Sequence, residues 1–235
     1  MSLSEGVEAL PFHGMLENLR NGVIPEGGEA VADAVTAVRR RIAWEDAAAP
    51  RIVALHTLDA LWLPEADVYR HMAACQLSHA EIDTRLELLA CRRERLFDLL
   101  AQQPVVYICP QAIADAMTIN GRCRVSGRQL LTDRDMTLEP ATLWKTLAMI
   151  VAAAGHQTLR FRWVDALPVG FDVTLYQKRG LCLTRPQDDL FIEQATTQET
   201  AAWAESILGW PEGDDPQGLA VLKEAIELLA TEGVG

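Results

Sequence analysis

The sequence has 235 residues and a formal net charge of −12 at pH 7, with 49% hydrophobic and 23% charged residues. This composition excludes an intrinsically disordered chain, and no segment approaches the ~20 consecutive apolar residues that a membrane-spanning helix needs. For the latter reason we expect no membrane partner. The excess of acidic groups repels a phosphate backbone, so we expect no nucleic-acid partner either.

The first fifty residues are expected to form an irregular segment followed by one helix. Residues 1–6 lack the basic and apolar stretches of a secretion signal, so we expect a cytoplasmic protein. Proline and glycine interrupt the chain up to the pair Gly27-Gly28. Aliphatic residues then recur at helical spacing, which predicts a helix over residues 29–44. No helix-turn-helix can be drawn here, because two compact helices around a tight turn are missing.

The clearest predicted element is a long helix in the middle of the chain. Residues 51–63 have mixed periodicity and predict either a helix or an extended segment, and a short helix is expected over residues 65–76. Ser78 and Glu81 then have the spacing of a capping box, in which each side chain bonds the other residue's backbone N–H. An apolar stripe behind this cap predicts a helix to about Gln102.

A β-rich run, Val-Val-Tyr-Ile-Cys, follows the long helix at residues 105–109 and predicts a buried strand. Further helices are expected over residues 111–117, 140–154, 200–208 and 219–230, and further strands over residues 158–164, 171–176, 181–184 and 190–193. The expected fold is therefore α+β, with a long central helix and further helices packed on a small, mostly antiparallel sheet. The expected division is an irregular segment with a helix (1–50), the main α+β domain (51–210), and a loop with an amphipathic helix (211–235).

Three residues have the spacing of metal ligands. His71, Cys75 and His79 recur every four residues, so on one unbroken helix they would share a face and could bind zinc. The cap at Ser78 favours a different interpretation, because a new helix starting there turns His79 away from the other two. We therefore expect no metal and no cofactor.

The five cysteines, at positions 75, 91, 109, 123 and 182, contain no Cys-x-x-Cys pair. We expect reduced thiols, mostly buried. Cys109 ends a predicted strand and precedes a predicted helix, a position where nucleophiles occur. However, Pro110 removes a backbone donor there and no histidine is close in sequence, so a packed core thiol is the favoured interpretation.

Four arginines cluster after the Asn120-Gly121 turn, and could clamp a carboxylate or a phosphate. The alternative, which we favour, is a solvated hairpin. The arginines are Arg122, Arg124, Arg128 and Arg134. The common phosphate-binding, dinucleotide-binding, serine-hydrolase and zinc-protease motifs are absent from the sequence.

A series of features between residues 51 and 209 carries a family resemblance. Leu63-Pro64 precedes Tyr69-Arg70, the long helix carries Arg-Arg-Glu-Arg at residues 92–95, and a late predicted strand ends in Leu-Phe-Ile-Glu at residues 190–193. The order resembles the C-terminal domain of actinobacterial WhiJ-like regulators, a domain of unknown function that normally follows an XRE-type helix-turn-helix.

The chain departs from the family's pattern at several positions. The Gly-Leu-Leu-Gln-Thr that normally follows the proline is absent, and Leu96 stands where the family has glutamine. The glutamate of the short helix is replaced around Pro110-Gln111. These departures make the chain resemble a divergent relative, without the DNA-reading module in residues 1–50.

The resemblance implies a stand-alone domain that binds a small molecule or a protein partner, with a pocket between the long helix and the sheet. The ligand-binding residues that it implies are Tyr69, Arg70, Arg92, Arg95 and Glu193. Glu193 is expected to pair with Arg92 or Arg95 as one wall of that pocket, and the alternative is that all three are exposed charges. A second hypothesis is a small-molecule biosynthetic enzyme whose arginines orient an anionic substrate. A third is an oligomerisation partner, for example a homodimer, acting through the terminal helix.

The net charge generates a first prediction. Because the long-range field of this surface repels a phosphate backbone, we expect the isolated protein to show no duplex DNA binding at physiological salt. Fluorescence anisotropy with labelled duplex at micromolar protein measures this directly. A salt-dependent rise in anisotropy would contradict the expectation.

Overall fold

A computed structural model describes most of the chain, namely residues 28–47, 50–155, 158–167, 170–176, 179–193 and 217–231. Its helices pack on a β-sheet, so the expected α+β class with a long central helix is confirmed. The helices in this part of the chain are α2 (Ala34–Ala47), the 3₁₀ helix η1 (Ala60–Trp62), α3 (Glu65–Ala74), α4 (His79–Leu100), α5 (Gln111–Asn120), α6 (Pro140–Ala154) and α8 (Gln217–Thr231).

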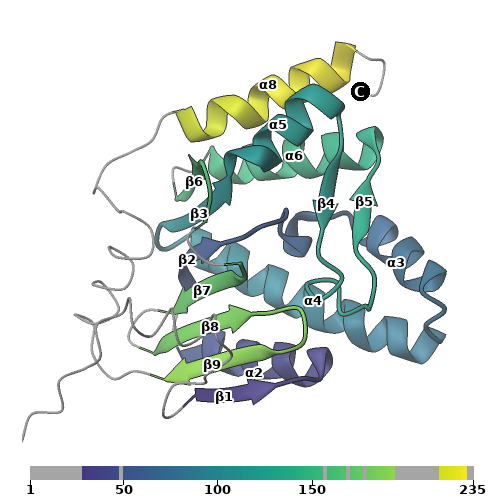
Figure 1. The fold of residues 1–235 in the computed structure, drawn as a ribbon, viewed down its shortest axis with the longest axis vertical. Coiled ribbons are helices and arrows are strands. Elements are labelled where there is room, and N and C mark those ends of the chain that lie inside the picture. Colours follow the sequence, from purple (N-terminus) through teal and green to yellow (C-terminus); the bar gives the residue numbers. More distant parts are fainter. Residues whose placement is uncertain are drawn as a thin grey trace, which may run out of the picture.

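The main sheet has seven strands, and a separate hairpin has two. The strands are β1 (Gly28–Val31), β2 (Pro50–Ala54), β3 (Val105–Pro110), β4 (Cys123–Val125), β5 (Met136–Leu138), β6 (Leu159–Val164), β7 (Asp172–Tyr176), β8 (Gly180–Thr184) and β9 (Asp189–Glu193). Their order in the main sheet is β1-β9-β8-β7-β2-β3-β6, while β4 pairs with β5 (Figure 1). Neighbours are antiparallel from β1 to β2, whereas β2, β3 and β6 run parallel.

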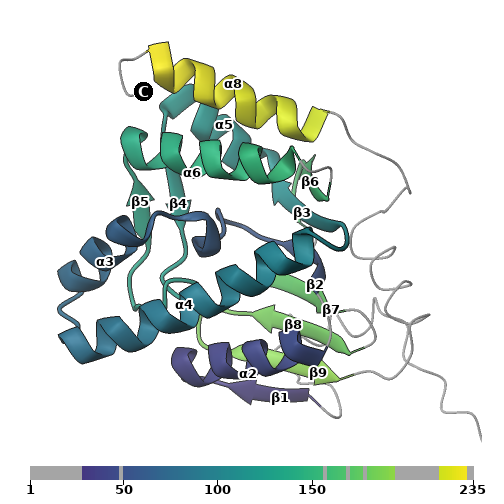
Figure 2. The ribbon, with the colours of Figure 1, turned by 180° about the vertical axis from the view of Figure 1, so that it is seen from behind.

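Helices α2 and α4 both lie across the same face of the main sheet (Figure 2). Helix α2 is attached through Trp44, whose ring packs edge-on against Tyr176 of β7 and Phe191 of β9, with centroids 5.4 and 5.1 Å apart. Helix α4 turns one stripe of aliphatic side chains toward the core, at the spacing that helical periodicity requires. These buried residues are Ile82, Leu89, Leu96 and Leu100.

Helix α4 begins where the capping box predicts. The Ser78 hydroxyl accepts a hydrogen bond from the Glu81 N–H at 3.4 Å, and the Glu81 carboxylate accepts one from the Ser78 N–H at 2.9 Å. The two bonds satisfy backbone donors that the first turn of a helix leaves unpaired. Because the cap starts a new helix, His79 does not continue helix α3, which carries His71.

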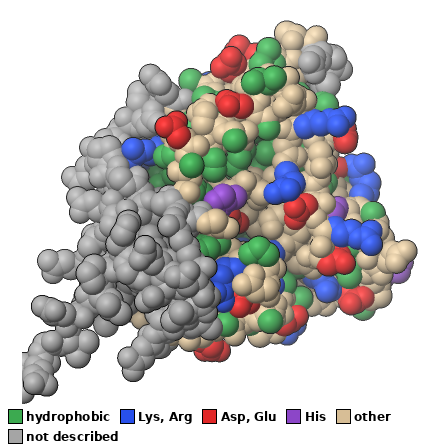
Figure 3. Space-filling model, viewed as in Figure 1, with side chains coloured by type: hydrophobic (Ala, Val, Ile, Leu, Met, Phe, Trp, Pro, Cys, Tyr) green, Lys and Arg blue, Asp and Glu red, His purple; other side chains and the backbone are tan. Residues whose placement is uncertain are grey.

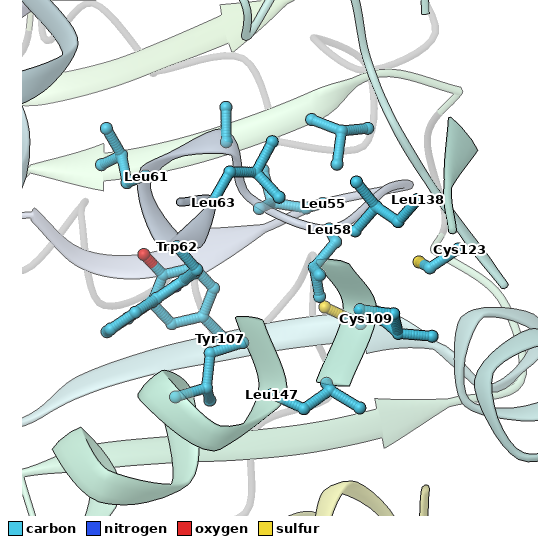
Figure 4. Close-up of a cluster of buried hydrophobic side chains, with 14 of the residues drawn as sticks. Leu55, Leu58, Leu61, Trp62, Leu63, Tyr107, Cys109, Cys123, Leu138 and Leu147 are labelled. Atoms are coloured by element: carbon cyan, nitrogen blue, oxygen red, sulfur yellow. The ribbon is translucent and has the colours of Figure 1, made fainter. Parts of the chain in front are cut away.

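The main hydrophobic core lies between α4, α6, α8 and the sheet. Tyr107 of β3 stacks on Phe161 of β6 with centroids 5.2 Å apart and meets Trp62 edge-on at 6.1 Å. Figure 4 shows Cys109, two residues further along β3, within the same cluster of buried side chains. Burial raises the pKa of the Cys109 thiol, which disfavours the reactive thiolate. The interpretation of Cys109 as a packed core thiol is confirmed.

The N-terminal elements differ from the sequence prediction. Helix α2 begins at Ala34 rather than at residue 29, because Gly28–Val31 forms strand β1 alongside β9. Asp33 caps the helix by accepting a hydrogen bond from the Thr36 N–H at 2.7 Å. Strand β1 lies at the sheet edge and contains no fully buried residue, so its sequence carries no alternating apolar pattern. Strand β1 thus belongs to the main sheet, and helix α2 packs on that sheet.

The remaining predicted elements begin and end within three residues of the observed ones. Residues 51–63, whose periodicity was mixed, divide into strand β2 and helix η1. The hairpin of β4 and β5 was not predicted, because strands of three residues are too short to show a period. The helix expected over residues 200–208 and the loop expected over residues 211–216 lie outside the described residues.

The terminal helix α8 packs on α5, α6 and β6. It buries Leu222, Ala225 and Leu229 in the main core, so its apolar face is used within the chain. At its start, the Trp163 indole N–H donates to the Gly218 carbonyl at 2.9 Å. The backbones approach so closely here that an added Cβ at Gly218 would lie 1.7 Å from the Phe161 carbonyl oxygen.

The surface of the described part carries both signs of charge. Figure 3 shows Lys and Arg side chains interspersed with Asp and Glu across one face of the molecule. Among the helices of the described residues, none is long and apolar enough to span a membrane.

The contact between α8 and β6 generates a second prediction. We expect Gly218→Ala to lower the free energy of unfolding by at least ~1–3 kcal/mol, because the new methyl group forces two backbones apart. Urea denaturation measures the change. The matched control is Gly170→Ala, whose Cβ meets nothing within 4 Å and should change stability by less than ~0.5 kcal/mol. Equal stabilities for the two variants would contradict the close approach.

Candidate functional site

A cavity of about 400 Å³ lies between helices α2 and α4 and the sheet face that they cover. It lies where the resemblance implied a pocket. Its apolar lining includes Val53 of strand β2, Leu55 just after that strand, and Leu96 and Leu99 of helix α4. Its polar lining comes from both helices, from strand β7 and from the segment before η1, so the site is assembled from parts of the chain far apart in sequence.

One wall of the cavity is a buried ion pair between the two helices. Arg92 of α4 donates from Nε and Nη2 to the Glu45 Oε1 of α2 at 3.1 and 2.8 Å. The Tyr176 hydroxyl donates to the same oxygen at 3.4 Å. The side chains of Arg92 and Glu45 are only 13% and 5% exposed, so each charge depends on the other for compensation.

A second buried charge cluster joins α2 to the sheet. Asp189 of β9 accepts from the Arg41 Nε at 2.9 Å and from the Arg128 Nε at 2.8 Å, one guanidinium on each carboxylate oxygen. Arg41 also contacts the Thr184 hydroxyl. Arg128 donates in addition to the carbonyls of Val31 and Ala32, at 2.9 and 2.8 Å. Both guanidiniums are therefore bonded to groups of the protein itself.

The floor of the cavity contains a buried carboxyl group that lacks a salt-bridge partner among the described residues. Asp59, the N-cap of η1, accepts from the Leu61 N–H at 3.0 Å and from the Tyr107 hydroxyl at 2.8 Å. Burial raises the pKa of the Asp59 carboxyl, and the nearby Arg92 guanidinium and the two hydrogen bonds oppose the shift. A titratable group with a raised pKa in a cavity is typical of functional sites.

Two further acceptors line the same floor. Thr174 of β7 is buried, and its hydroxyl forms no hydrogen bond with any of the described residues. Asp172, two residues earlier on the same strand face, accepts from the Gln129 Nε2 at 3.0 Å. The Gln129 carbonyl oxygen in turn accepts from the Ala60 N–H at 3.0 Å, which holds the amide in one orientation. The cavity therefore presents oxygen acceptors on its floor and paired guanidiniums on its walls.

The structure places two of the five residues that the resemblance implied at this cavity. Arg92 lies in the wall, and Arg95 lies at the rim, where it pairs with Asp46 of α2 at 2.6 Å. Tyr69 and Arg70 lie on α3, away from the cavity lining. The Tyr69 hydroxyl contacts His79 Nδ1 at 3.3 Å, and Arg70 pairs with Asp67 on its own helix.

The predicted pairing of Glu193 with Arg92 or Arg95 is wrong. Glu193 is the last residue of β9 and lies opposite Gly180 of β8. It pairs there with Arg179 at 3.3 Å, and its side chain is 57% exposed. The carboxylates that meet the α4 arginines come instead from α2, a helix whose position on the sheet the sequence does not show.

The other constellations of the sequence have structural partners. The His71 Nε2 lies 3.0 Å from the Arg134 carbonyl oxygen and 3.7 Å from the Cys75 sulfur. No group of three or more His, Cys, Asp or Glu in the described residues has the geometry of a metal site. The five cysteines are free, and three of them, Cys109, Cys123 and Cys182, are buried.

The arginine cluster divides between two environments. Arg122 and Arg124 are exposed and lie 3.8 and 3.4 Å from Glu139 and Asp135, as the solvated interpretation predicts. Arg128 is different, because its side chain is only 12% exposed and clamps Asp189. A carboxylate clamp therefore exists, but its carboxylate belongs to the same chain.

The residues that form the floor of the cavity are not among those predicted from the sequence. Asp59 had a usable signal, because it is a lone acid within an apolar stretch from Leu58 to Leu63. Thr174 had none, since threonine is common in strands and its face is set by the pairing of β7 with β2.

Comparison of the sequence and the structure with known proteins finds no matching family model, no matching curated protein and no matching solved structure.

The wall of the cavity generates a third prediction. Glu45→Gln leaves the buried Arg92 without a carboxylate, so we expect it to lower the free energy of unfolding by ~3–5 kcal/mol. In a domain of this size, that corresponds to roughly 6–20 °C in melting temperature. The matched control is Glu193→Gln, which removes an exposed pair and should cost less than ~1 kcal/mol. Equal melting temperatures for the two variants would contradict the assignment of the wall.

Proposed function

We propose that the cavity between α2, α4 and the sheet binds a small uncharged molecule that donates hydrogen bonds and has an apolar part. The observation that carries this proposal is the contrast between the two kinds of polar group in the lining. The acceptors of Asp59 and Thr174 are open to the cavity, whereas the guanidinium donors are bonded to carboxylates of the chain. A volume of about 400 Å³ is within the range of small-molecule sites.

The charged lining of the cavity disfavours an anionic ligand. The carboxyl groups of Asp59, Asp98 and Asp172 line the cavity, and its three arginines, Arg41, Arg92 and Arg95, are each paired with a carboxylate of the chain. The paired carboxylates are those of Asp189, Glu45 and Asp46. An anionic ligand would have to displace one of these carboxylates from its arginine, and would also face Asp172. This argues against arginines that orient an anionic substrate.

The apolar lining of the cavity indicates that part of the ligand is apolar. Leu55 and Leu96 approach from the sheet and from α4, and they exclude water from any group placed between them. Burial of apolar area supplies most of the binding free energy, at ~25 cal/mol per Å², while the hydrogen bonds to Asp59 and Thr174 supply orientation.

The resemblance to the C-terminal domain of WhiJ-like regulators supports a sensor-type role for the ligand that binds in this cavity. Both helices that wall the cavity are held to each other by the Arg92–Glu45 pair, so a ligand can act on their relative position. An enzymatic role is the second candidate. The raised pKa of Asp59, together with its hydrogen bond from Tyr107, is the observation that favours it, because such a pair can transfer a proton.

The proposal predicts a defined pattern of ligand-induced stabilisation. A thermal-shift screen should include small amides, alcohols and ureides with apolar substituents, together with the matching carboxylates. We expect stabilisation only by the uncharged compounds, by ~2.7 kcal/mol at a concentration of 100 times Kd. Thr174→Val keeps the shape of the residue but removes its hydroxyl, and should weaken binding by about tenfold.

The control for this experiment is Thr84→Val, on α4 outside the cavity lining, which should bind like the parent. Stabilisation by carboxylates alone would contradict the proposal. Equal affinity in Thr174→Val and the parent would remove the cavity floor from the binding site.

A further inference from the structure

A second polar site lies at the end of strand β2, outside the charged walls of the cavity. His56 lies two residues after the end of β2, and Asp172 begins the neighbouring strand β7. The His56 Nδ1 lies 3.2 Å from the Asp172 Oδ1, and the same oxygen accepts from the His56 backbone N–H at 2.8 Å. The carboxyl ends of the parallel strands β2, β3 and β6 meet at this edge, which is where open α/β sheets bind ligands.

Asp172 is held in one orientation by donors on both of its oxygens. Oδ1 accepts from His56, and Oδ2 accepts from the Gln129 Nε2. Gln129 is itself anchored to the Ala60 N–H and to the Thr57 hydroxyl, at 3.0 and 3.2 Å. Because the carboxylate can only accept, the imidazole must present a proton on Nδ1, and in the neutral ring this leaves the lone pair on Nε2.

The imidazole is accessible, whereas the carboxylate is not. The side chain of His56 is 34% exposed and that of Asp172 is 11% exposed. His56 lines two adjoining recesses, of about 730 and 470 Å³. No hydrogen-bond partner of its Nε2 is found in the described part of the chain. A fixed carboxylate behind an exposed imidazole is the arrangement of a general base that activates water.

The surroundings of His56 indicate the chemical class of the substrate. The smaller recess has an apolar side formed by Pro110, Ile113 and Leu167. Arg124 borders both recesses, and its side chain is 67% exposed, with Asp135 at 3.4 Å as its ion partner. Because this ion pair is exposed and therefore weak, Arg124 can exchange Asp135 for an anionic group of a ligand. The recess then fits a small molecule with an apolar group at one end and an anionic group at the other.

We propose that His56 is the general base of a hydrolytic site for small carboxylic esters that carry an anionic group, and that Asp172 is its positioning residue. The His56 Nε2 takes a proton from water while the water oxygen bonds to the ester carbonyl carbon. The tetrahedral adduct then breaks its bond to the alkoxy oxygen, which receives the proton from Nε2. The products are a carboxylic acid and an alcohol, and water is the only co-reactant.

This site is distinct from the proposed ligand cavity, although Asp172 borders both. Thr174 and the Arg92–Glu45 pair do not line either recess at His56. Loss of ligand binding in Thr174→Val and loss of hydrolysis in His56→Gln are therefore independent outcomes.

The test uses the full chain and two probe esters, mono-p-nitrophenyl glutarate, which is anionic, and p-nitrophenyl butyrate, which is not. We expect the parent to hydrolyse the glutarate ester with a kcat/KM about 100-fold above that of His56→Gln, the typical contribution of a general base. Arg124→Gln should lose the preference for the glutarate ester over the butyrate ester. His79→Gln, which removes an exposed histidine at the start of α4, is the matched control and should retain the parent's activity.

The role of Asp172 is tested by a spectroscopic readout that needs no substrate. In ¹⁵N-resolved spectra of the neutral ring, His56 of the parent should carry its proton on Nδ1. Asp172→Asn should shift the equilibrium between the two tautomers of His56. In kinetic assays the same variant should lower kcat with little change in KM. A proton on Nε2 in the parent would overturn the proposal. So would activity in His56→Gln within twofold of the parent, or a parent no faster than buffer on both esters.

Discussion

The junction of Arg41, Asp189 and Arg128 is the interaction on which the architecture around the cavity depends. The carboxylate of Asp189, whose side chain is 4% exposed, binds the guanidinium of Arg41 from α2 and that of Arg128 from the segment between β4 and β5. Arg128 extends the junction to the carbonyls that follow β1. Four separate parts of the chain are thereby fixed at one point. Removing the Asp189 carboxylate would leave two buried guanidiniums without compensation, at a cost of ~3–5 kcal/mol.

The cavity is a consequence of how these charges are satisfied. Ion pairs need long side chains with defined geometry, so α2 and α4 cannot settle on the sheet as closely as helices with an aliphatic interface. The Arg92–Glu45 pair spans the helices, and the space beneath it is lined by Leu55 and Thr174. The same pairing engages each arginine of the lining with a carboxylate of the chain, which is why we propose an uncharged ligand rather than an anion.

Much of the fold is predictable because it depends on local patterns. The stripe of Ile82, Leu89 and Leu96 specifies one face of a helix, and Ser78 specifies where that helix begins. The site is less predictable. Arg92 and Arg95 were placed near a pocket, but their carboxylate partners are Glu45 and Asp46 rather than Glu193. Pairing over such sequence distances depends on the crossing of helices, which no local period encodes.

The sequence by itself determined the α+β class, the long capped helix and the burial of Cys109, because hydrophobic periodicity and capping act over a few neighbouring residues. Only the tertiary structure decided which charges meet, that β1 joins β9, and that His56 lies against Asp172. Those contacts join residues far apart in the sequence, such as Arg41 and Asp189, or Gly28 and Ile192. Their partners are selected by the order of strands in the sheet, and that order follows from the packing of the whole chain.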